Sequence, residues 1–505
     1  DEAVVEELHL KESPLWMKIV QIIGIDQLSL ARLRSLLQLR AGKEGGYSGF
    51  GWCAWFPGLF HTKMAEMTGF FLTHWGTSDS GTKNPGSLSF HNNLLRRLPI
   101  SLTSLPTFRV CRDLTYVSLY ARILHCLLIV SDKDSLDAYA HSTDWITFQS
   151  DTEAIYNQFA NTTIVDDLRQ CRNTEQEQSQ HRPDTSSKVT EGDMVFENAV
   201  LFMRDALLSR EFADAIKVGD SGRILLVLRI WALSFRGNGR SKYAYEMLSL
   251  IHNLTSVWPK GIRNIVLKNW LVNTSGRSNG FIEADLLQEH LNYWIKTIYK
   301  AHGSNSTWEW LFTISPCIAG LRDLADEMGM ELGEKTQGTR HAPPDLSKDI
   351  QILMDSLAEH EVYKVKKGRT LSTADDIVTD VITVGVQLLL QGSTSLLDEY
   401  NLTFKRLQRR SRVKPVIGES DHYTTTEIPV GPETRPQPDS DIDLPPTDLD
   451  EETTYDYFTP TLAEILDGED EPLVGLETAE DVALDMDLIE VEVDVEVDID
   501  TDVDD

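Results

Sequence analysis

The stretch Gly219-Asp220-Ser221-Gly222-Arg223 opens the part of the chain that decides the fold, residues 218–296. It leads into residues 223–235, which are apolar on nearly all sides and therefore predict a helix buried on most of its faces. We expect this helix at the centre of a helical domain. Polar residues placed around buried helices in this way are typical either of a functional site or of a tightly built core, and the residue types leave both open.

Residues 285–298 give a second helical pattern in the same stretch. At about 100° per residue, Asp285, Glu289 and Asn292 fall on one stripe, which Lys296 continues. The stripe predicts either a catalytic or partner-binding face, or a solvated face stabilised by charge pairs. His290 lies in the apolar arc of the helix, where we expect a hydrogen-bonded core histidine.

Length and charge limit the class of protein. With 505 residues the chain exceeds the size at which a single core stops growing, so we expect two or three domains. The formal net charge is −32, but residues 437–505 hold 27 acidic and no basic side chains, which leaves −5 for residues 1–436. This near balance argues against a broadly basic nucleic-acid-binding surface and permits a local basic patch.

Cysteine usage and hydropathy predict an intracellular protein with no membrane segment. The five cysteines are odd in number and far apart, which fits neither a disulfide framework nor a zinc site with paired ligands. The longest apolar runs are shorter than the roughly 18 to 20 residues of a membrane span, and no signal peptide is visible. The chain begins with Asp1 rather than methionine, so we expect a further segment upstream.

The order of the patterns predicts an α/β N-terminal part followed by a larger, mostly α-helical part. Residues 16–25 are apolar, Asp26 follows them, and residues 28–40 repeat leucine at helical spacing, which predicts a strand, a carboxylate and a helix. A second strand-then-helix unit, without the carboxylate, covers residues 50–75. We expect an α/β part at 1–171, a linker at 172–193, a helical part at 194–335, a helical C-terminal segment at 336–416 and a disordered acidic tail at 417–505.

Asp26 is a candidate metal ligand, because a carboxylate at the end of a strand can hold a divalent cation at the edge of a sheet. The alternative is that Asp26 caps the helix that follows it. Asp220 has the same two interpretations, and a cap explains the residue types around it economically. The spacing shows no phosphate-binding loop and no Ser-His-Asp, Cys-His or His-Glu-x-x-His arrangement.

Two charged segments near the C-terminal end give predictions about the binding partners and the cellular location of the protein. Residues 405–414 contain six basic side chains, which predict either a nuclear-localisation or phosphate-contacting segment or a solubilising run beside an acidic tail. The acidic tail fits recruitment of basic protein partners.

Several motifs together carry a resemblance to a known family. They are Asp26-Gln27-Leu28-Ser29 with Arg32, Gly58-Leu59-Phe60-His61-Thr62-Lys63-Met64, Gly219-Asp220 with Arg223, Gly239-Arg240 with Tyr243 and Glu246, Asn273-Thr274 with Gly276, and Asp285 with Glu289-His290-Leu291-Asn292. This set resembles the uncharacterised group called domain of unknown function 6589, abundant in fungi and also found in animals. The resemblance covers about residues 25–328 and implies membership of a group without supplying a mechanism.

Members of this group resemble proteins encoded by mobile elements, and the strand–Asp–helix opening is similar to part of a ribonuclease-H-like transposase core. The resemblance implies a set of carboxylates around Mg²⁺ and DNA as the partner. Asp26 would be the second carboxylate and Glu289 the third, with Asp220 as a substitute for Glu289. The first would lie upstream of Asp1, so the core in this chain is expected to be incomplete.

These observations lead to two hypotheses from different classes. The first is a mobile-element-derived protein, descended from a metal-dependent DNA transposase or nuclease, whose remaining activity is left open. The second is a non-catalytic helical scaffold with an acidic recruiting tail. Substitution of Asp26 and Glu289 by alanine separates them, since a ligand role predicts loss of metal binding without loss of fold.

Overall fold

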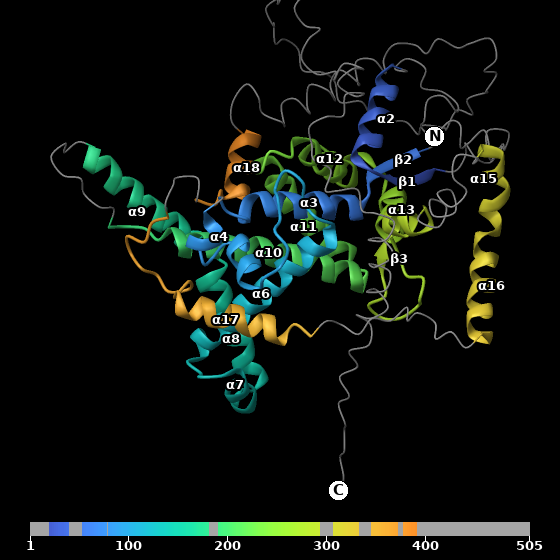
Figure 1. The fold of residues 1–505 in the computed structure, drawn as a ribbon. Coiled ribbons are helices and arrows are strands. Elements are labelled where there is room, and N and C mark those ends of the chain that lie inside the picture. The colour runs from blue at the N-terminus through green and yellow to red at the C-terminus, as the bar shows by residue number, and fades with distance from the viewer. Residues whose placement is uncertain are drawn as a thin grey trace, which may run out of the picture. The chain divides into compact units, whose positions relative to one another are not determined.

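The structure is a computed structural model that describes residues 20–39, 53–77, 79–180, 190–292, 307–332, 345–371 and 377–390. Within these ranges the chain is mostly helical and has few strands (Figure 1). The expected acidic tail, the basic segment 405–414 and Lys296 lie outside the described residues.

The described elements follow one another in this order. The helices are α2 (Gln27–Leu39), α3 (Leu59–His74), α4 (Ser80–Lys83), α5 (Leu88–Leu94), α6 (Phe108–Ser131), α7 (Leu136–Ser142), α8 (Trp145–Phe159), α9 (Thr163–Gln180), α10 (Met194–Val218), α11 (Ser221–Gly237), α12 (Ser241–His252), α13 (Lys260–Asn269), an unlabelled helix at 284–292, α15 (Trp308–Ile314), α16 (Ile318–Glu331), α17 (Ser347–Glu359) and α18 (Val381–Leu390). A π-helical turn (Asn253–Val257) and a 3₁₀ turn (Ser315–Cys317) join α12 to α13 and α15 to α16. The strands are β1 (Gln21–Ile25), β2 (Cys53–Pro57), β3 (Leu271–Val272) and β4 (Ile282–Glu283).

The chain divides into two compact units. Among the described residues, the smaller unit contains 20–23, 28–39 and 53–55, and the larger one contains 24–27 and everything from Phe56 to Leu390. Helices α3 to α18 therefore belong to the larger unit.

The strand–Asp–helix opening is confirmed by β1, Asp26 and α2. β1 and β2 form a two-stranded sheet, and β3 pairs with β4 in an antiparallel register of Leu271 with Glu283 and Val272 with Ile282. These are the two sheets of the described residues, so the N-terminal part is mainly helical where a fuller α/β arrangement was expected.

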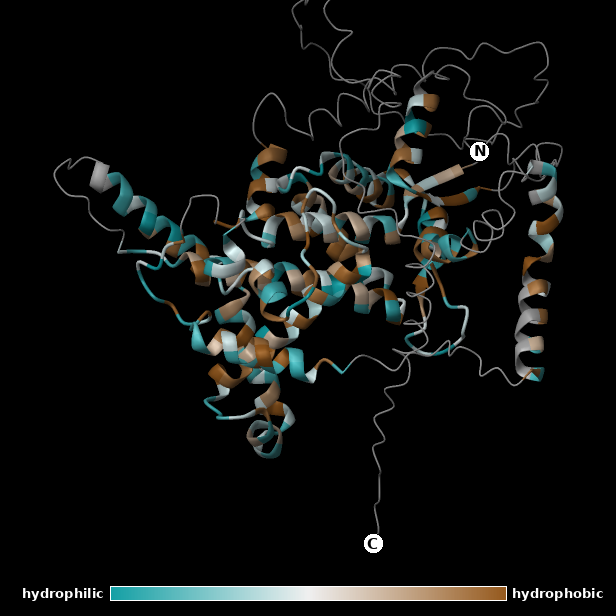
Figure 2. Cartoon of the chain, in the orientation of Figure 1, coloured by the Kyte–Doolittle hydropathy of each residue, from teal (hydrophilic) through white to brown (hydrophobic). Residues whose placement is uncertain are grey.

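Helix α10 is the most deeply buried element of the larger unit. Met194–Met203 are buried without a break, including the polar Glu197 and Asn198. α3, α6, α9 and α11 pack around α10. Figure 2 shows many hydrophobic residues, in brown, among the central helices. The core thus forms around α10 rather than around α11.

The expectation that residues 223–235 are buried on most sides is confirmed, except along one narrow stripe that contains the exposed Leu226 and Arg229. Ile224, Leu228 and Trp231 are buried, whereas Leu226 is 58% exposed. Arg223 and Arg229 lie on the same side as Leu226, and their charged groups keep that side in contact with water.

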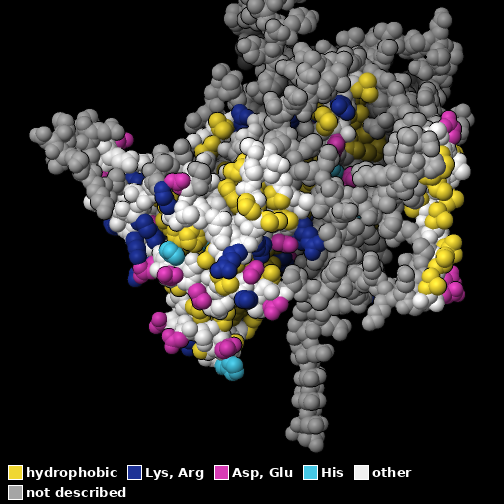
Figure 3. Space-filling view, in the orientation of Figure 1, with side chains coloured by type: hydrophobic (Ala, Val, Ile, Leu, Met, Phe, Trp, Pro, Cys, Tyr) yellow, Lys and Arg dark blue, Asp and Glu magenta, His cyan; other side chains and the backbone are white. Residues whose placement is uncertain are grey.

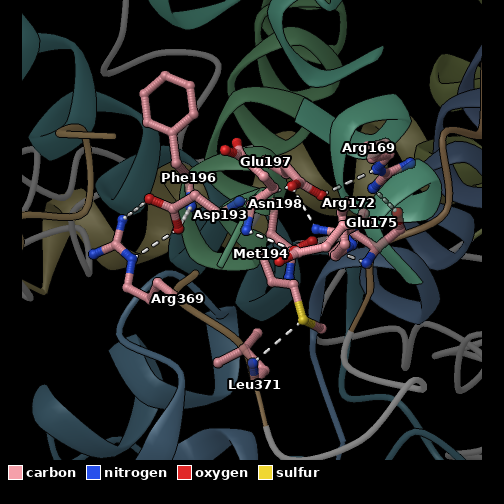
Figure 4. A network of polar contacts seen from close by, with 12 residues as sticks. Arg169, Arg172, Glu175, Asp193, Met194, Phe196, Glu197, Asn198, Arg369 and Leu371 are labelled. Atoms are coloured by element: carbon pink, nitrogen blue, oxygen red, sulfur yellow. Dashed lines mark hydrogen bonds and ion pairs between the residues drawn. The ribbon is translucent and has the colours of Figure 1, made fainter. Parts of the chain in front are cut away.

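A buried polar network fixes the start of α10 (Figure 4). Asp193 caps the helix by accepting from the Phe196 backbone N–H, and both its oxygens accept from the Arg369 guanidinium at 2.7 Å. Glu197 accepts from Arg172 Nη1 at 2.5 Å and from the Asp193 backbone N–H at 3.0 Å. Because these carboxylates are fully buried, their pairing with arginine satisfies charges that would otherwise be costly to bury.

The segment expected to be a linker begins as helix. α9 continues to Gln180, through the Glu- and Gln-rich residues from Arg172 onward, and residues 181–189 are outside the described part. Glu and Gln are good helix formers, so a polar composition here reflects an exposed helix rather than a loop.

One described helix, α6, is long and apolar enough to cross a bilayer. In this structure 56% of its most apolar 18-residue window is buried inside the protein, and Leu114, Val117 and Ala121 belong to the hydrophobic core. α6 is thus used as a core helix. All five cysteines are free thiols.

Helices α11 and α18 cross at very short range. A Cβ atom added to Gly237 would lie 1.8 Å from the Val381 carbonyl oxygen, and one added to Gly385 would lie 2.0 Å from the Leu233 carbonyl oxygen. The two glycines are therefore what permits the backbones to approach, as in other close helix crossings.

Candidate functional site

The carboxylate of Asp285 caps helix α3 from a distant part of the chain. Its Oδ1 accepts from the Phe60 backbone N–H at 3.2 Å, and its Oδ2 accepts from the His61 backbone N–H at 3.1 Å. The side chain of Asp285 is 8% exposed. The first N–H groups of a helix have no partner within the helix and carry partial positive charge, so a carboxylate is well suited to this position.

Gly58 makes room for this carboxylate. It is the residue before α3 and provides no side-chain cap of its own. A Cβ atom on Gly58 would lie 2.2 Å from Asp285 Oδ2, so no larger residue fits without displacing Asp285. The Gly58 N–H donates to the Ile25 carbonyl at 2.8 Å, which places the end of β1, and hence Asp26, beside the start of α3.

A short two-stranded sheet holds Asp285 in place. Lys63 Nζ pairs with Glu283 Oε1 at 2.5 Å, and Glu283 is almost completely buried in β4. The Ala284 N–H donates to the Trp270 carbonyl at 3.0 Å. These contacts fix both sides of the chain just before the helix at 284–292, which carries Asp285 and Glu289.

His61 is the centre of the site. Its Nδ1 lies 3.0 Å from Asp285 Oδ2, and its side chain is 29% exposed. Burial lowers the pKa of His61, but the hydrogen bond and charge of Asp285, together with the charges of Glu289 and Asp26, outweigh it and raise the pKa above its usual value. Three carboxylates from distant positions in the sequence therefore act on one imidazole.

Two of the three predicted site residues lie near enough to His61 to affect its pKa. Asp26 and Glu289 both act electrostatically on His61, and both are half-buried. Asp26 is also the residue directly before α2, so its alternative role as a helix cap stays open.

Asp220, the third predicted residue, is a helix cap. Its Oδ1 accepts from the backbone N–H groups of Gly222 and Arg223, at 2.9 and 3.1 Å, and this bonding begins α11. The capping interpretation of Asp220 is confirmed. Asp220 is not among the charges named as acting on His61, and its catalytic role remains a prediction.

The described residues do not by themselves form a complete site for a divalent cation. Within them, no group of three or more His, Cys, Asp or Glu side chains is arranged to hold a metal ion. Asp285 already accepts hydrogen bonds on both oxygens, and Asp26 and Glu289 each have further interactions of their own. Mg²⁺ commonly binds one or two carboxylates and completes its shell with water and substrate phosphates, so a site built on Asp26 and Glu289 would be an open one and not a closed cage.

The sequence did not predict the roles of His61, Asp285 and Glu283. The available signal was Gly58, a helix start without a capping side chain, which calls for a carboxylate from elsewhere. Glu246 of α12 is 1% exposed. His290 is buried as expected, but its buried Nε2 has no hydrogen-bond partner among the described residues, and burial lowers its pKa to about 4.

A second group of buried titratable residues was also not predicted. Glu66, His74 and Asp205 line a cavity of about 20 Å³ between α3, α10 and α11. His74 Nε2 lies 2.9 Å from Asp205 Oδ2, and Ser209 Oγ donates to Glu66 Oε2 at 3.1 Å. Burial raises the pKa of Glu66 to about 8, so this carboxyl group is mostly protonated at neutral pH.

Comparison with known proteins gives a family and no further relative. Residues 1–341 match a family of unknown function (DUF6589). No curated protein and no solved structure matches the chain. The matched range includes Asp26, His61, Asp285 and Glu289.

Proposed function

The chain belongs to DUF6589, a family of unknown function, so we propose a function from its own geometry. We propose that it is a mobile-element-derived protein that uses Asp26 and Glu289 as a Mg²⁺ site to cut or transfer DNA strands. The observation that carries this proposal is that both carboxylates act on the ring of His61. Remote carboxylates that meet at one point are what metal-dependent phosphoryl transfer requires.

Each residue has a separate role in this proposal. Asp26 and Glu289 hold the cation, which when bound neutralises charge on a phosphate and orients the attacking water. The raised pKa of His61 favours its protonated form, and its Nε2 lies on the opposite side of the ring from Asp285. That edge can donate a hydrogen bond or a proton to a phosphate oxygen. Asp285 is a positioning residue, since it orients His61 through Nδ1.

The comparison with a ribonuclease-H-like core belongs to the same proposal. β1, Asp26 and the helix that carries Glu289 would correspond to the second and third carboxylate positions of such a core. Transposon origin and a nuclear location are proposed with it.

The test is a calorimetric titration of the full chain with Mg²⁺ and Mn²⁺, followed by a cleavage assay on DNA. We expect Asp26→Asn and Glu289→Gln to weaken cation binding by at least tenfold with unchanged helix content. Asp220→Asn is the matched control, because asparagine also caps helices and the change removes the same charge. Wild-type affinity in both site variants, or equal loss in all three, would overturn the proposal.

A non-catalytic scaffold is the second candidate function, and a specific observation favours it. Among the described side chains of α15, α16 and the residue after them, Phe312, Leu324, Met328 and Leu332 are each more than half exposed. Figure 3 shows this row of hydrophobic side chains along the two helices. An exposed apolar stripe of this kind is typical of a protein–protein contact. Loss of helix content in Asp26→Ala and Glu289→Ala, in place of loss of metal binding, would favour the scaffold.

A further inference from the structure

The apolar side of helix α8 continues beyond the core of the larger unit. The C-terminal half of α8 is anchored by Ile155 and Phe159, which are buried in the hydrophobic core. At about 100° per residue, Trp145 and Phe148 lie on the same side of the helix as these two residues. Trp145 is nevertheless 68% exposed and Phe148 is 39% exposed, so this side of α8 meets solvent at its N-terminal end.

Three adjacent side chains form an apolar patch there. The ring centroids of Trp145 and Phe148 are 5.5 Å apart, and the neighbouring Ile146 is 76% exposed. A single exposed apolar residue is ordinary on a protein surface, whereas a group of large ones is typical of a binding site. Aromatic side chains are enriched at the centres of protein–protein interfaces, where they contribute much of the affinity.

The surface around this patch is acidic. Residues 134–160 contain no Lys or Arg and five acidic side chains: Asp134, Asp137, Asp144, Asp151 and Glu153. In the described part of the chain none of the five forms an ion pair. Asp144 accepts from the Thr147 backbone N–H as the cap of α8, and Asp151 accepts from the Tyr139 hydroxyl at 2.8 Å. No cation of the protein neutralises these charges, so they act on whatever approaches the patch. The patch and the five acidic side chains are here called the α7–α8 surface.

The charge of the α7–α8 surface limits what can cover it. A nucleic acid or an anionic membrane would bring further negative charge, and both bind proteins through Lys and Arg side chains. A second copy docked through the same surface would place like charges opposite one another. A protein segment with apolar side chains flanked by Lys or Arg has the complementary shape of charge, since it offers an apolar centre and a basic rim.

We propose that the α7–α8 surface binds a basic amphipathic segment of a partner protein. Apolar side chains of that segment pack on Trp145, Ile146 and Phe148, and its Lys or Arg side chains lie over Asp137 and Glu153. The apolar contact provides most of the affinity, and the charges select and orient the partner. None of these residues takes part in the proposed function, so each proposal can be tested without the other.

The test is photo-crosslinking of the full chain to a synthetic peptide at about 50 mM salt, which leaves charge interactions largely unscreened. The peptide has about 14 residues, or four helical turns, with leucine on one side, lysine on the other and one photo-reactive leucine. Mass spectrometry maps the labelled residues. It thereby distinguishes α8 from the acidic residues 437–505, which can also attract a basic peptide. We expect labelling of α8 between residues 145 and 156.

The apolar patch is tested by Trp145→Ser/Ile146→Ser. We expect this variant to reduce labelling of α8 by about tenfold, because the centre of an interface carries most of its affinity. Leu98→Ser/Leu226→Ser is the matched control, since both leucines are more than half exposed and lie outside α7 and α8. The control should change labelling of α8 by less than about twofold. All four positions are exposed, so helix content and Tm should stay close to wild type.

The acidic rim is tested by Asp137→Asn/Glu153→Gln, which we expect to reduce labelling of α8 by about threefold or more. Glu177→Gln/Glu359→Gln removes the same charge at exposed positions on α9 and α17 and should have no such effect. Two further peptides separate the contributions, one with glutamate for lysine and one with serine for all but the photo-reactive leucine. Both should label α8 about tenfold less than the lysine–leucine peptide.

Four results would overturn the inference. The first is labelling confined to residues 437–505, and the second is equal labelling of α8 by the glutamate peptide. The third is a carbodiimide cross-link, formed without peptide, between Asp137 or Glu153 and the chain's own residues 405–414, which would make that segment the occupant. The fourth is a change of oligomeric state in Trp145→Ser/Ile146→Ser during sedimentation, which would make a second copy the occupant.

Discussion

Asp285 Oδ2 lies 3.0 Å from His61 Nδ1 and also accepts from the His61 backbone N–H at 3.1 Å. One carboxylate oxygen therefore fixes both the start of α3 and the orientation of the imidazole. Any change at Asp285 therefore acts on stability and on the electrostatics of the site together.

The His61–Asp285 pair predicts a pH-dependent stability. The folded pKa of His61 is raised, so the stabilisation is fully present below the unfolded pKa of about 6.5 and is lost as pH rises through the folded pKa. A double-mutant cycle of His61→Gln and Asp285→Asn by urea unfolding should give a coupling of about 1 to 3 kcal/mol at pH 6, and less at pH 9. A coupling that is constant from pH 6 to pH 9 would show that the pair does not titrate in this way.

Gly58→Ala is expected to destabilise the protein. The added Cβ would lie 2.2 Å from Asp285 Oδ2 and would push the carboxylate off the helix start. Loss of a cap costs about 0.5 to 2 kcal/mol, which chemical unfolding measures readily. Gly320→Ala in α16 is the control, since a Cβ there meets nothing within 4 Å and alanine favours a helix. Equal stability of wild type and Gly58→Ala would rule out the capping geometry.

The buried carboxyl group of Glu66 predicts a second pH dependence of stability, and the direction of its raised pKa gives the sign. Its folded pKa of about 8 exceeds that of an exposed glutamate, so the folded protein binds the proton more tightly than the unfolded chain. The free energy of unfolding of the wild type, relative to that of Glu66→Gln, should be constant below about pH 4. It should fall as pH rises toward 8, by at most about 1.4 kcal/mol per pH unit. Glu359→Gln, at an exposed position, should show no such difference. Parallel pH profiles for wild type and Glu66→Gln would contradict the buried, protonated carboxyl group.

Gly385→Ala tests the close crossing of α11 and α18. The new Cβ would lie 2.0 Å from the Leu233 carbonyl oxygen, so the helices must separate. Overpacking of this kind costs about 1 to 3 kcal/mol, and thermal unfolding should detect it. Gly237→Ala meets Val381 at the same crossing, so the double variant should cost less than the sum of the two single changes. Strict additivity would indicate that the two contacts are independent.

The sequence predicted the local elements better than the contacts between them. The strand before Asp26, the helix after it and the Asp220 cap are short-range features with clear residue signals, and the structure has each of them. The polar segment after Arg172 was expected to be a loop, because its composition resembles a linker as much as an exposed helix.

The candidate site was predicted only in part, because the sequence indicates local elements better than contacts between distant residues. Asp26 was chosen as the carboxylate at the end of an expected strand and Glu289 as a carboxylate on the polar stripe of an expected helix, and both act on His61. His61 and Asp285 were not assigned these roles, because a contact between residues more than 200 positions apart leaves no local periodicity. In the sequence, only the absence of a capping side chain at Gly58 indicated that the start of α3 binds a group from elsewhere in the chain.

The most direct test of the central claim is the pKa of His61, measured by NMR on histidine-labelled full chain with and without Mg²⁺. The account predicts a pKa above that of a free histidine, a decrease in Asp26→Asn and in Glu289→Gln, and a further decrease in the wild type when Mg²⁺ binds beside the ring. A His61 pKa that ignores both substitutions and Mg²⁺ would show that these carboxylates do not form one site.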